Sequence, residues 1–226
     1  VAITFCCGLF TAIACRNAIS EGLDLRQSFV LTTGVWVVLP LFAALPFVTG
    51  APDLSGTDAV FEAMSGLTTT ATTVITGLDA LPMGINRWRA MLNWLGGLGI
   101  VIVALIFLPV MKVGGMQFFR TEGFDTLGKV LPRALDISKA LLSIYLVMTL
   151  GCALAYRAFG METFEAVIHA LSALSTGGFS NRDTSFTEFA VPLHYVTVVA
   201  MILSTLPFIR FIQLFRGEVK PLWQDL

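Results

Sequence analysis

Charge-free apolar stretches alternate with short polar connections along the chain. About 20 helical residues are needed to cross the ~30 Å hydrocarbon layer of a membrane. Four of the stretches are long enough for a full crossing, and the first is the end of a crossing helix that we expect to begin upstream of Val1. The pattern predicts an all-α membrane protein. The stretches are residues 1–15, 29–48, 90–111, 140–156 and 189–209.

Two further charge-free segments, 63–78 and 166–181, are too short and too rich in hydroxyl groups to cross as lipid-facing helices. Each begins with an apolar helical pattern and ends in Ser, Thr and Gly. This pattern favours re-entry, in which a short helix enters the membrane and a polar loop returns to the same face. Because a re-entrant segment begins and ends on the same face, the long segments before and after it still cross the membrane in opposite directions.

The sequence contains an internal repeat with an offset of 107 residues. Residues 58–73, DAVFEAMSGLTTTATT, align with residues 165–180, EAVIHALSALSTGGFS. The same offset brings 29–48 onto 136–155, which is one long apolar segment onto another. The predicted unit is a helix, a short re-entrant helix with a polar return loop, and a second helix. Because one unit cannot close a pore alone, we expect several copies around an axis.

Composition and charge agree with this class and give an orientation. Hydrophobic residues make up 56% of the 226 residues and charged residues only 13%. If residues 16–28, 112–139 and 210–226 face one side, that side carries ten of the fourteen Lys and Arg residues, so the positive-inside rule assigns it to the cytoplasm. The sequence contains no nucleophile motif, phosphate loop or metal-spaced ligand cluster, and no basic patch, so it indicates neither an enzyme nor nucleic-acid binding.

The polar return loops carry the candidate chemistry. Backbone groups at membrane depth must be buried in protein or line water, because unpaired N–H and C=O groups are costly in hydrocarbon. Gly177 and Gly178 permit positive φ and a close approach of carbonyl oxygens to a bound species. Such carbonyls replace the hydration shell of a monovalent cation. The negative dipole end of each short helix also favours a cation, so the loops are candidate parts of a cation filter.

Five segments together resemble the TrkH/TrkG potassium-uptake membrane subunits of the Trk/Ktr/HKT superfamily: AMSGLTTTATTVITGLDALP, WRAMLNWLGGLGI, KVGGMQFFRTE, KVLPRA and HALSALSTGGFS. The resemblance covers nearly the whole chain. It implies potassium uptake across the bacterial inner membrane by a multi-pass, pore-forming subunit. Such proteins are similar to a potassium channel folded into one polypeptide, with four helix, pore-loop and helix repeats around one pore.

The resemblance also implies a division of the chain. Residues 1–28 are the end of a leading transmembrane helix plus a cytoplasmic connector, and 29–111 are the first pore repeat. Residues 112–135 are a second cytoplasmic connector, and 136–226 are the second pore repeat with a cytoplasmic tail. Two repeats cannot surround a four-part pore, so we expect either that the natural chain continues beyond Leu226 or that two copies combine.

By the same resemblance, the transported ion is potassium and the filter consists mainly of backbone carbonyls. No other cofactor is expected. The implied partners are membrane lipid, the remaining pore repeats, a second copy in a full-length homodimer, and a cytosolic nucleotide-binding regulatory subunit. The connector 112–133 either docks that subunit or forms a solvated turn with an interfacial helix. The implied filter residues are Thr69, Thr70, Ala71, Thr72, Ser175, Thr176, Gly177 and Gly178.

One filter residue departs from the family pattern. The first loop of the family usually reads Thr-Thr-Thr-Gly, whereas this chain has Ala71 at the position that aligns internally with Gly178. A Cβ penalises positive φ by roughly 1 kcal/mol or more, so this quarter of the filter is expected to be looser or turned. The sequence therefore predicts weaker selectivity for potassium over sodium. It also leaves open an alternative, a non-conducting membrane scaffold that retains a filter-like fold.

Other polar and small residues have two interpretations each. The GGLG segment at 96–99 is either a gating hinge or, as we favour, a close-packing site between helices. His169 either senses pH or contacts ions or, as we favour, is buried and bonded to a neighbour. Glu62 is either a cation attractor or a solvated or hydrogen-bonded carboxylate. Arg87 and Arg89, with Trp88 between them, are typical of a membrane-surface anchor.

Overall fold

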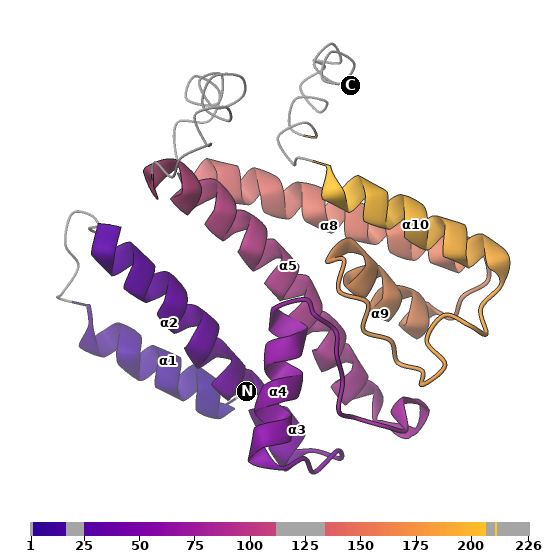
Figure 1. Ribbon diagram of the computed structural model, residues 1–226, viewed down its shortest axis with the longest axis horizontal. Helices are drawn as coiled ribbons and strands as arrows, with labels where there is room; N and C mark the ends of the chain where they lie inside the picture. The colour runs from indigo at the N-terminus through magenta and orange to yellow at the C-terminus, as the bar shows by residue number, and fades with distance from the viewer. Residues whose placement is uncertain (1, 17–24, 112–133, 207–210, 212–226) are drawn as a thin grey trace.

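The computed structural model describes residues 2–16, 25–111, 134–206 and 211. Within these residues every regular element is a helix, which confirms the predicted all-α class. Figure 1 shows the elements in chain order. They are α1 (Ala2–Ala14), α2 (Leu25–Ala43), α3 (Leu45–Thr49), α4 (Gly56–Leu67), the 3-10 turn η1 (Leu78–Ala80), α5 (Met83–Met111), α8 (Ala134–Ala158), α9 (Thr163–Leu174) and α10 (Val191–Thr205).

The long helices coincide with the predicted crossings. By length and hydropathy, two helical segments in the described part of the chain qualify as membrane spans, Phe29–Thr49 and Lys139–Ala158. The first is interrupted at Ala44, between α2 and α3, because Pro46 at the start of α3 has no N–H to continue the helical bonding. The predicted connector 112–133 and, except for residue 211, the predicted cytoplasmic tail 210–226 lie outside the described residues.

The two short helices preserve the internal repeat. Both α4 and α9 have 12 residues, and their bounds differ by 107 positions, from 56 to 163 and from 67 to 174. The residues that follow the two helices also match in backbone conformation. Thr68, after α4, has φ of −83° and ψ of 3°. Ser175, after α9, has φ of −78° and ψ of −3°. The repeat seen in the sequence is therefore a repeat of backbone geometry.

Helix α5 joins the two halves. It contacts both α4 and α9, and Figure 1 shows it running between them. One apolar core lies on the α4 side, around Phe47, Ala63 and Leu92. The other lies on the α9 side, around Tyr145 and Tyr156 of α8, which lies beside α10. This arrangement brings the ends of both short helices to one helix, α5.

The outer faces of α8 and α10 are apolar and uncovered in this chain. Large hydrophobic side chains are exposed along both helices, which is typical of contact with lipid or with other membrane helices rather than with water. These side chains are Leu142, Leu146, Val147, Leu150 and Leu154 on α8 and Tyr195, Val198, Val199 and Ile202 on α10.

Candidate functional site: the loops after the two short helices

The first loop leaves α4 in an unusual backbone conformation. The N–H groups of Thr70 and Ala71 both donate to the carbonyl of Ser65, at 3.0 and 3.3 Å. Thr69 and Ala71 have positive φ, +56° and +57°, whereas Thr70 between them does not. The hydroxyl of Ser65 donates to the carbonyl of Thr72 at 2.6 Å, so this carbonyl faces the short helix. The loop therefore alternates between left-handed and ordinary residues.

The second loop repeats this design. The N–H of Gly177 donates to the carbonyl of Ser172 at 3.1 Å, as Thr70 does to Ser65 in the first loop. Thr176 and Gly178 have positive φ, +54° and +99°, with Gly177 between them outside the positive range. Four of the eight sequence-predicted filter residues thus have left-handed backbones, and three of these four carry a Cβ. Strain of this kind, of order 1–3 kcal/mol per residue, is typical of functional sites.

Ala71 adopts the left-handed conformation that its glycine counterpart adopts. Its φ of +57° has the same sign as the +99° of Gly178 but differs by about 40°. The difference in φ between the two loops at this position is therefore a shift within the positive-φ region.

Two glycines let α5 approach both loops. A Cβ at Gly96 would collide with the backbone carbonyl of Leu67, at the end of α4. A Cβ at Gly97 would come within 2.9 Å of the Ser175 side chain and 3.0 Å of its Cα. Gly99 has no such neighbour within 4 Å. The contacts at 96 and 97 support close packing as the reason for this part of the GGLG segment.

A buried ion pair lies behind the first loop. Nε of Arg89, on α5, is 2.8 Å from Oε1 of Glu62, on α4, and the two side chains are 1% and 0% exposed. The Glu62 carboxylate also accepts hydrogen bonds from the Thr73 hydroxyl, at 2.9 and 3.0 Å, and from the Val74 N–H, at 3.0 Å. Of the two interpretations of Glu62, the structure supports a hydrogen-bonded carboxylate.

The interpretation of Arg89 as a membrane-surface anchor is wrong. A surface anchor leaves its charged group in water, whereas Arg89 is buried and ion-paired. Arg87, two residues earlier, is exposed, and its guanidinium lies 5.7 Å from the Phe164 ring. Two arginines that lie two residues apart on one helix thus face different environments. The useful sequence signal was an acid inside a short apolar helix, because a carboxylate in such a place requires a partner.

Arg89 also reaches the second loop. Its Nη1 donates to the carbonyl of Ser180 at 2.8 Å, and its guanidinium lies 4.3 Å from the centre of the Phe179 ring. One turn further along α5, Asn93 lies between the carbonyl of Gly66 and the N–H of Phe179. When the amide oxygen and nitrogen are assigned so that each has a partner, the nitrogen donates to Gly66 at 2.8 Å and the oxygen accepts from Phe179 at 3.2 Å. Sequence reasoning missed Asn93 because a single Asn in a long apolar helix gives no sign of its partners.

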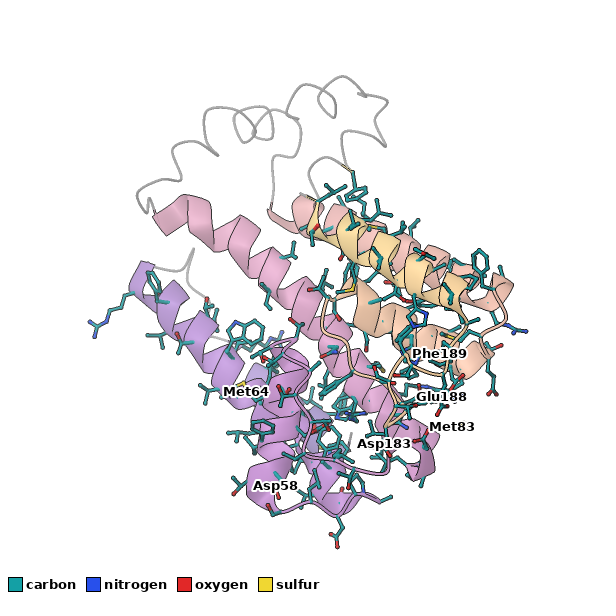
Figure 2. All side chains as sticks on the ribbon, turned by 45° about the vertical axis from the view of Figure 1, so that its right-hand side comes forward. Asp58, Met64, Met83, Asp183, Glu188 and Phe189 are labelled. Carbon is teal, nitrogen blue, oxygen red and sulfur yellow. The ribbon has the colours of Figure 1, made fainter. Side chains whose placement is uncertain are left out.

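Charged side chains tie the outer ends of the loops together. The Asp183 carboxylate accepts from the N–H groups of Gly77 and Leu78, both at 3.1 Å. Arg182 binds Glu165 at 2.6 Å and Glu188 at 2.9 Å, and the hydrogen bond to Glu165 raises the pKa of the Arg182 guanidinium. Figure 2 shows Asp183 and Glu188 on the segment between α9 and α10. Hydrogen bonds therefore join the segment after the second loop, at Asp183, to the segment after the first loop, at Gly77 and Leu78.

His169 occupies the position in α9 that Glu62 occupies in α4, yet its surroundings differ. The ring is 2% exposed and lies edge-on to Phe186 and Phe189, with centroids at 4.6 and 5.2 Å. The expected burial is confirmed. In the described part of the chain, its buried Nε2 has no hydrogen-bond partner, in contrast to the Glu62 carboxylate.

The class of protein follows from three features: long apolar helices with uncovered faces, an internal repeat of backbone geometry, and polar loops with positive φ. Together they indicate a helical membrane protein built from repeated units. The sequence comparison extends this to a family. The chain belongs to the TrkH family of cation transport proteins, because the family model, described as "TrkH: Cation transport protein", matches residues 1–223. By that description, the family consists of transport proteins.

Individual relatives agree with this assignment. The potassium uptake protein TrkI of Halomonas elongata is 45% identical over 201 residues, which cover 88% of this chain and 41% of the relative. TrkH of Escherichia coli K12 is 38% identical over 205 residues, covering 88% and 42%. The crystal structure of the potassium transporter TrkH from Vibrio parahaemolyticus matches 99% of this chain and 46% of that chain, with 34% identity and a TM-score of 0.81. The chain spans about two fifths of the length of the curated relatives it matches.

Proposed function

We propose that this chain contributes two filter loops to a potassium uptake pathway across the bacterial inner membrane. The proposed filter groups are backbone carbonyls of residues 69–72 and 175–178. The observation that carries the proposal is the alternation of positive and ordinary φ at equivalent positions of both loops, Thr69 and Ala71 in one and Thr176 and Gly178 in the other. The names of the relatives, which are potassium uptake proteins, support the choice of ion.

The physical argument starts from the alternating backbone. Neighbouring residues of opposite handedness turn successive N–H groups to one side, which leaves their carbonyls on the other. In the loops, N–H groups of Thr70, Ala71 and Gly177 face back to the serine carbonyls of the short helices. Carbonyls facing away from the helices are free to replace the hydration shell of a potassium ion. The carbonyl of Thr72 contributes less, because the Ser65 hydroxyl already binds it.

In this proposal α4 and α9 are re-entrant pore helices. Each has only 12 residues, about 18 Å of helix, which is too short to cross the hydrocarbon layer. Their C-terminal dipole ends lie next to the loops and stabilise a cation there. The proposed organisation is a first pore repeat at 29–111 and a second at 136–226, joined by a cytoplasmic connector at 112–135 and preceded by the end of a leading helix with its connector at 1–28.

The proposed partners follow from the same assignment. Lipid or other pore repeats cover the apolar faces of α8 and α10. A cytosolic nucleotide-binding regulatory subunit docks on the cytoplasmic side, and the full-length protein forms a homodimer. The alternative of a non-conducting scaffold rested on Ala71 and on the two-repeat length, and the shared sign of φ at Ala71 and Gly178 weighs against the first of these two grounds.

The test uses the full-length protein in a bacterium that lacks its own potassium uptake systems. Gly178→Val is expected to abolish growth at low potassium and potassium influx, because a β-branched side chain resists φ of +99°. Gly160→Val is the matched control, since Gly160 has φ of +94° in the turn before α9, outside the loops, and likewise has open space around it. Absence of potassium influx in the expressed native protein, or equal loss in both variants, contradicts the proposal.

A further inference from the structure

Arg89 and Asn93 lie one helical turn apart on α5, and together they contact α4, the helix before the first loop, and residues 179 and 180 at the end of the second loop. On the side of the first loop, Arg89 binds the Glu62 carboxylate and Asn93 binds the Gly66 carbonyl. On the side of the second loop, Arg89 binds the Ser180 carbonyl and Asn93 binds the Phe179 N–H. Both side chains are buried, at 1% and 0% exposed. We call these two residues the α5 clamp.

We propose that the α5 clamp positions the second loop against the first and thereby sets the selectivity of both. This inference rests on the proposed function, since it assigns a role to residues behind the filter rather than in it. Arg89 and Asn93 are positioning residues, because they act through backbone groups of the loops and not on the ion.

The second loop depends on the clamp because, among the described residues, the recorded side-chain bonds of its own short helix reach only past residues 175–180, where Glu165 binds Asn181 at 3.4 Å and Arg182 at 2.6 Å. In the first loop Glu62 binds the Thr73 hydroxyl and the Val74 N–H. The equivalent residue in α9 is His169, which packs against phenylalanine rings. The Ser65 hydroxyl binds a loop carbonyl, whereas the equivalent Ser172 hydroxyl has no hydrogen-bond partner in the described part of the chain. The missing support comes from α5, which belongs to the other repeat.

The guanidinium of Arg89 suits this role by its shape. Its Nε binds Glu62 and its Nη1 binds Ser180, while its flat face lies over the Phe179 ring. A planar fork offers several donors in fixed directions, whereas a lysine ammonium is a point charge with rotating donors. Lysine at this position therefore keeps the charge balance with Glu62 but does not hold both partners in the same geometry.

The test compares three forms of the full-length protein: native, Arg89→Lys and the control Arg87→Lys. Arg87 is exposed and its guanidinium contacts a ring of α9 but neither loop. The first measurement is amide hydrogen exchange of the peptide covering 175–181, in purified protein. Loss of one charge-assisted hydrogen bond is expected to speed exchange of this peptide about tenfold in Arg89→Lys, with no change in Arg87→Lys. Exchange in α9, which precedes this peptide, is expected to stay at the native rate.

The second measurement is the potassium-to-sodium permeability ratio in liposomes. We expect the ratio to fall about three- to tenfold in Arg89→Lys and to stay native in Arg87→Lys. A third variant, Glu62→Gln with Arg89→Gln, guards against a folding defect because it removes both buried charges together. It is expected to fold and to show the same fast exchange in 175–181.

The outcomes separate the two proposals. Native exchange in 175–181 with Arg89→Lys overturns the clamp, whatever the flux. Fast exchange spread over α5 and α9 also overturns it, because that result indicates general destabilisation. Fast exchange confined to the loop with an unchanged permeability ratio overturns the role in selectivity. A native protein that passes no potassium, yet shows the confined exchange effect, contradicts the proposed function and leaves loop positioning supported.

Discussion

The two loops have the same backbone design and different support. Both follow a 12-residue helix, bond back to an equivalent serine carbonyl and place positive φ at equivalent positions. The first is held by Glu62 of its own short helix, whereas the second is held by Arg89 and Asn93 of α5. A repeated backbone thus does not require repeated side chains. It requires that each strained loop is held by some group, here from α4 for the first loop and from α5 for the second.

The largest expected effect comes from removing the acid that supports the first loop. Glu62→Leu leaves Arg89 buried without its counter-charge, which is expected to lower the free energy of unfolding by about 3–5 kcal/mol. The measurement is thermal unfolding of the purified full-length protein. The loss of the bonds to Thr73 and Val74 also frees the first loop.

The matched change in the second repeat is His169→Leu, at the equivalent position. Leucine fits the contacts with Phe186 and Phe189 and removes a buried nitrogen for which the described residues give no partner. The free energy of unfolding is expected to change by less than about 1.5 kcal/mol. Equal destabilisation by the two leucine variants contradicts the difference in support between the loops.

An intermediate effect is expected where α5 meets the end of α4. Gly96→Ala places a Cβ against the Leu67 carbonyl, so α4 or α5 has to shift, at a cost of about 1–3 kcal/mol. Gly99→Ala is the control on the same helix, since no neighbour lies within 4 Å, and alanine favours the helix. Thermal unfolding of the two variants measures the difference. Similar melting temperatures would mean that α5 does not need to approach the first loop this closely.

Most of the fold follows from hydropathy and the internal repeat. Charge-free segments of about 20 residues predict the long helices, since a membrane leaves few alternatives. The short helices were recognised because the 107-residue offset pairs two polar endings, TTTATT and STGGFS. Among the described residues, the ends of helices differ from the prediction, as where Pro46 separates α3 from α2.

The support behind the loops was not predictable from one sequence. Arg87, Trp88 and Arg89 form a local pattern that is typical of a membrane surface, and local patterns do not tell which side of a helix is buried. The position of Arg89 depends on contacts with Glu62 and Ser180, which lie 27 and 91 residues away in sequence. Asn93 depends in the same way on Gly66 and Phe179.

The smallest expected effect is that of Ala71→Gly, and it concerns selectivity rather than stability. Glycine relieves about 1 kcal/mol of left-handed strain in the folded loop, but it also gives the unfolded chain freedom worth about 0.4–1 kcal/mol. Because these terms nearly cancel, the melting temperature is expected to stay unchanged. The loop, however, becomes free to move from φ of +57° toward the +99° of Gly178.

That freedom makes the two loops more alike, so we expect Ala71→Gly to raise the potassium-to-sodium permeability ratio about two- to fivefold, a change below 1.4 kcal/mol. The reciprocal Gly178→Ala is the control in the opposite direction. No atom lies within 4 Å of its added Cβ, so only backbone strain acts, and the ratio is expected to fall. An unchanged ratio in Ala71→Gly would mean that the shared sign of φ, and not its size, decides how a loop of this kind receives the ion.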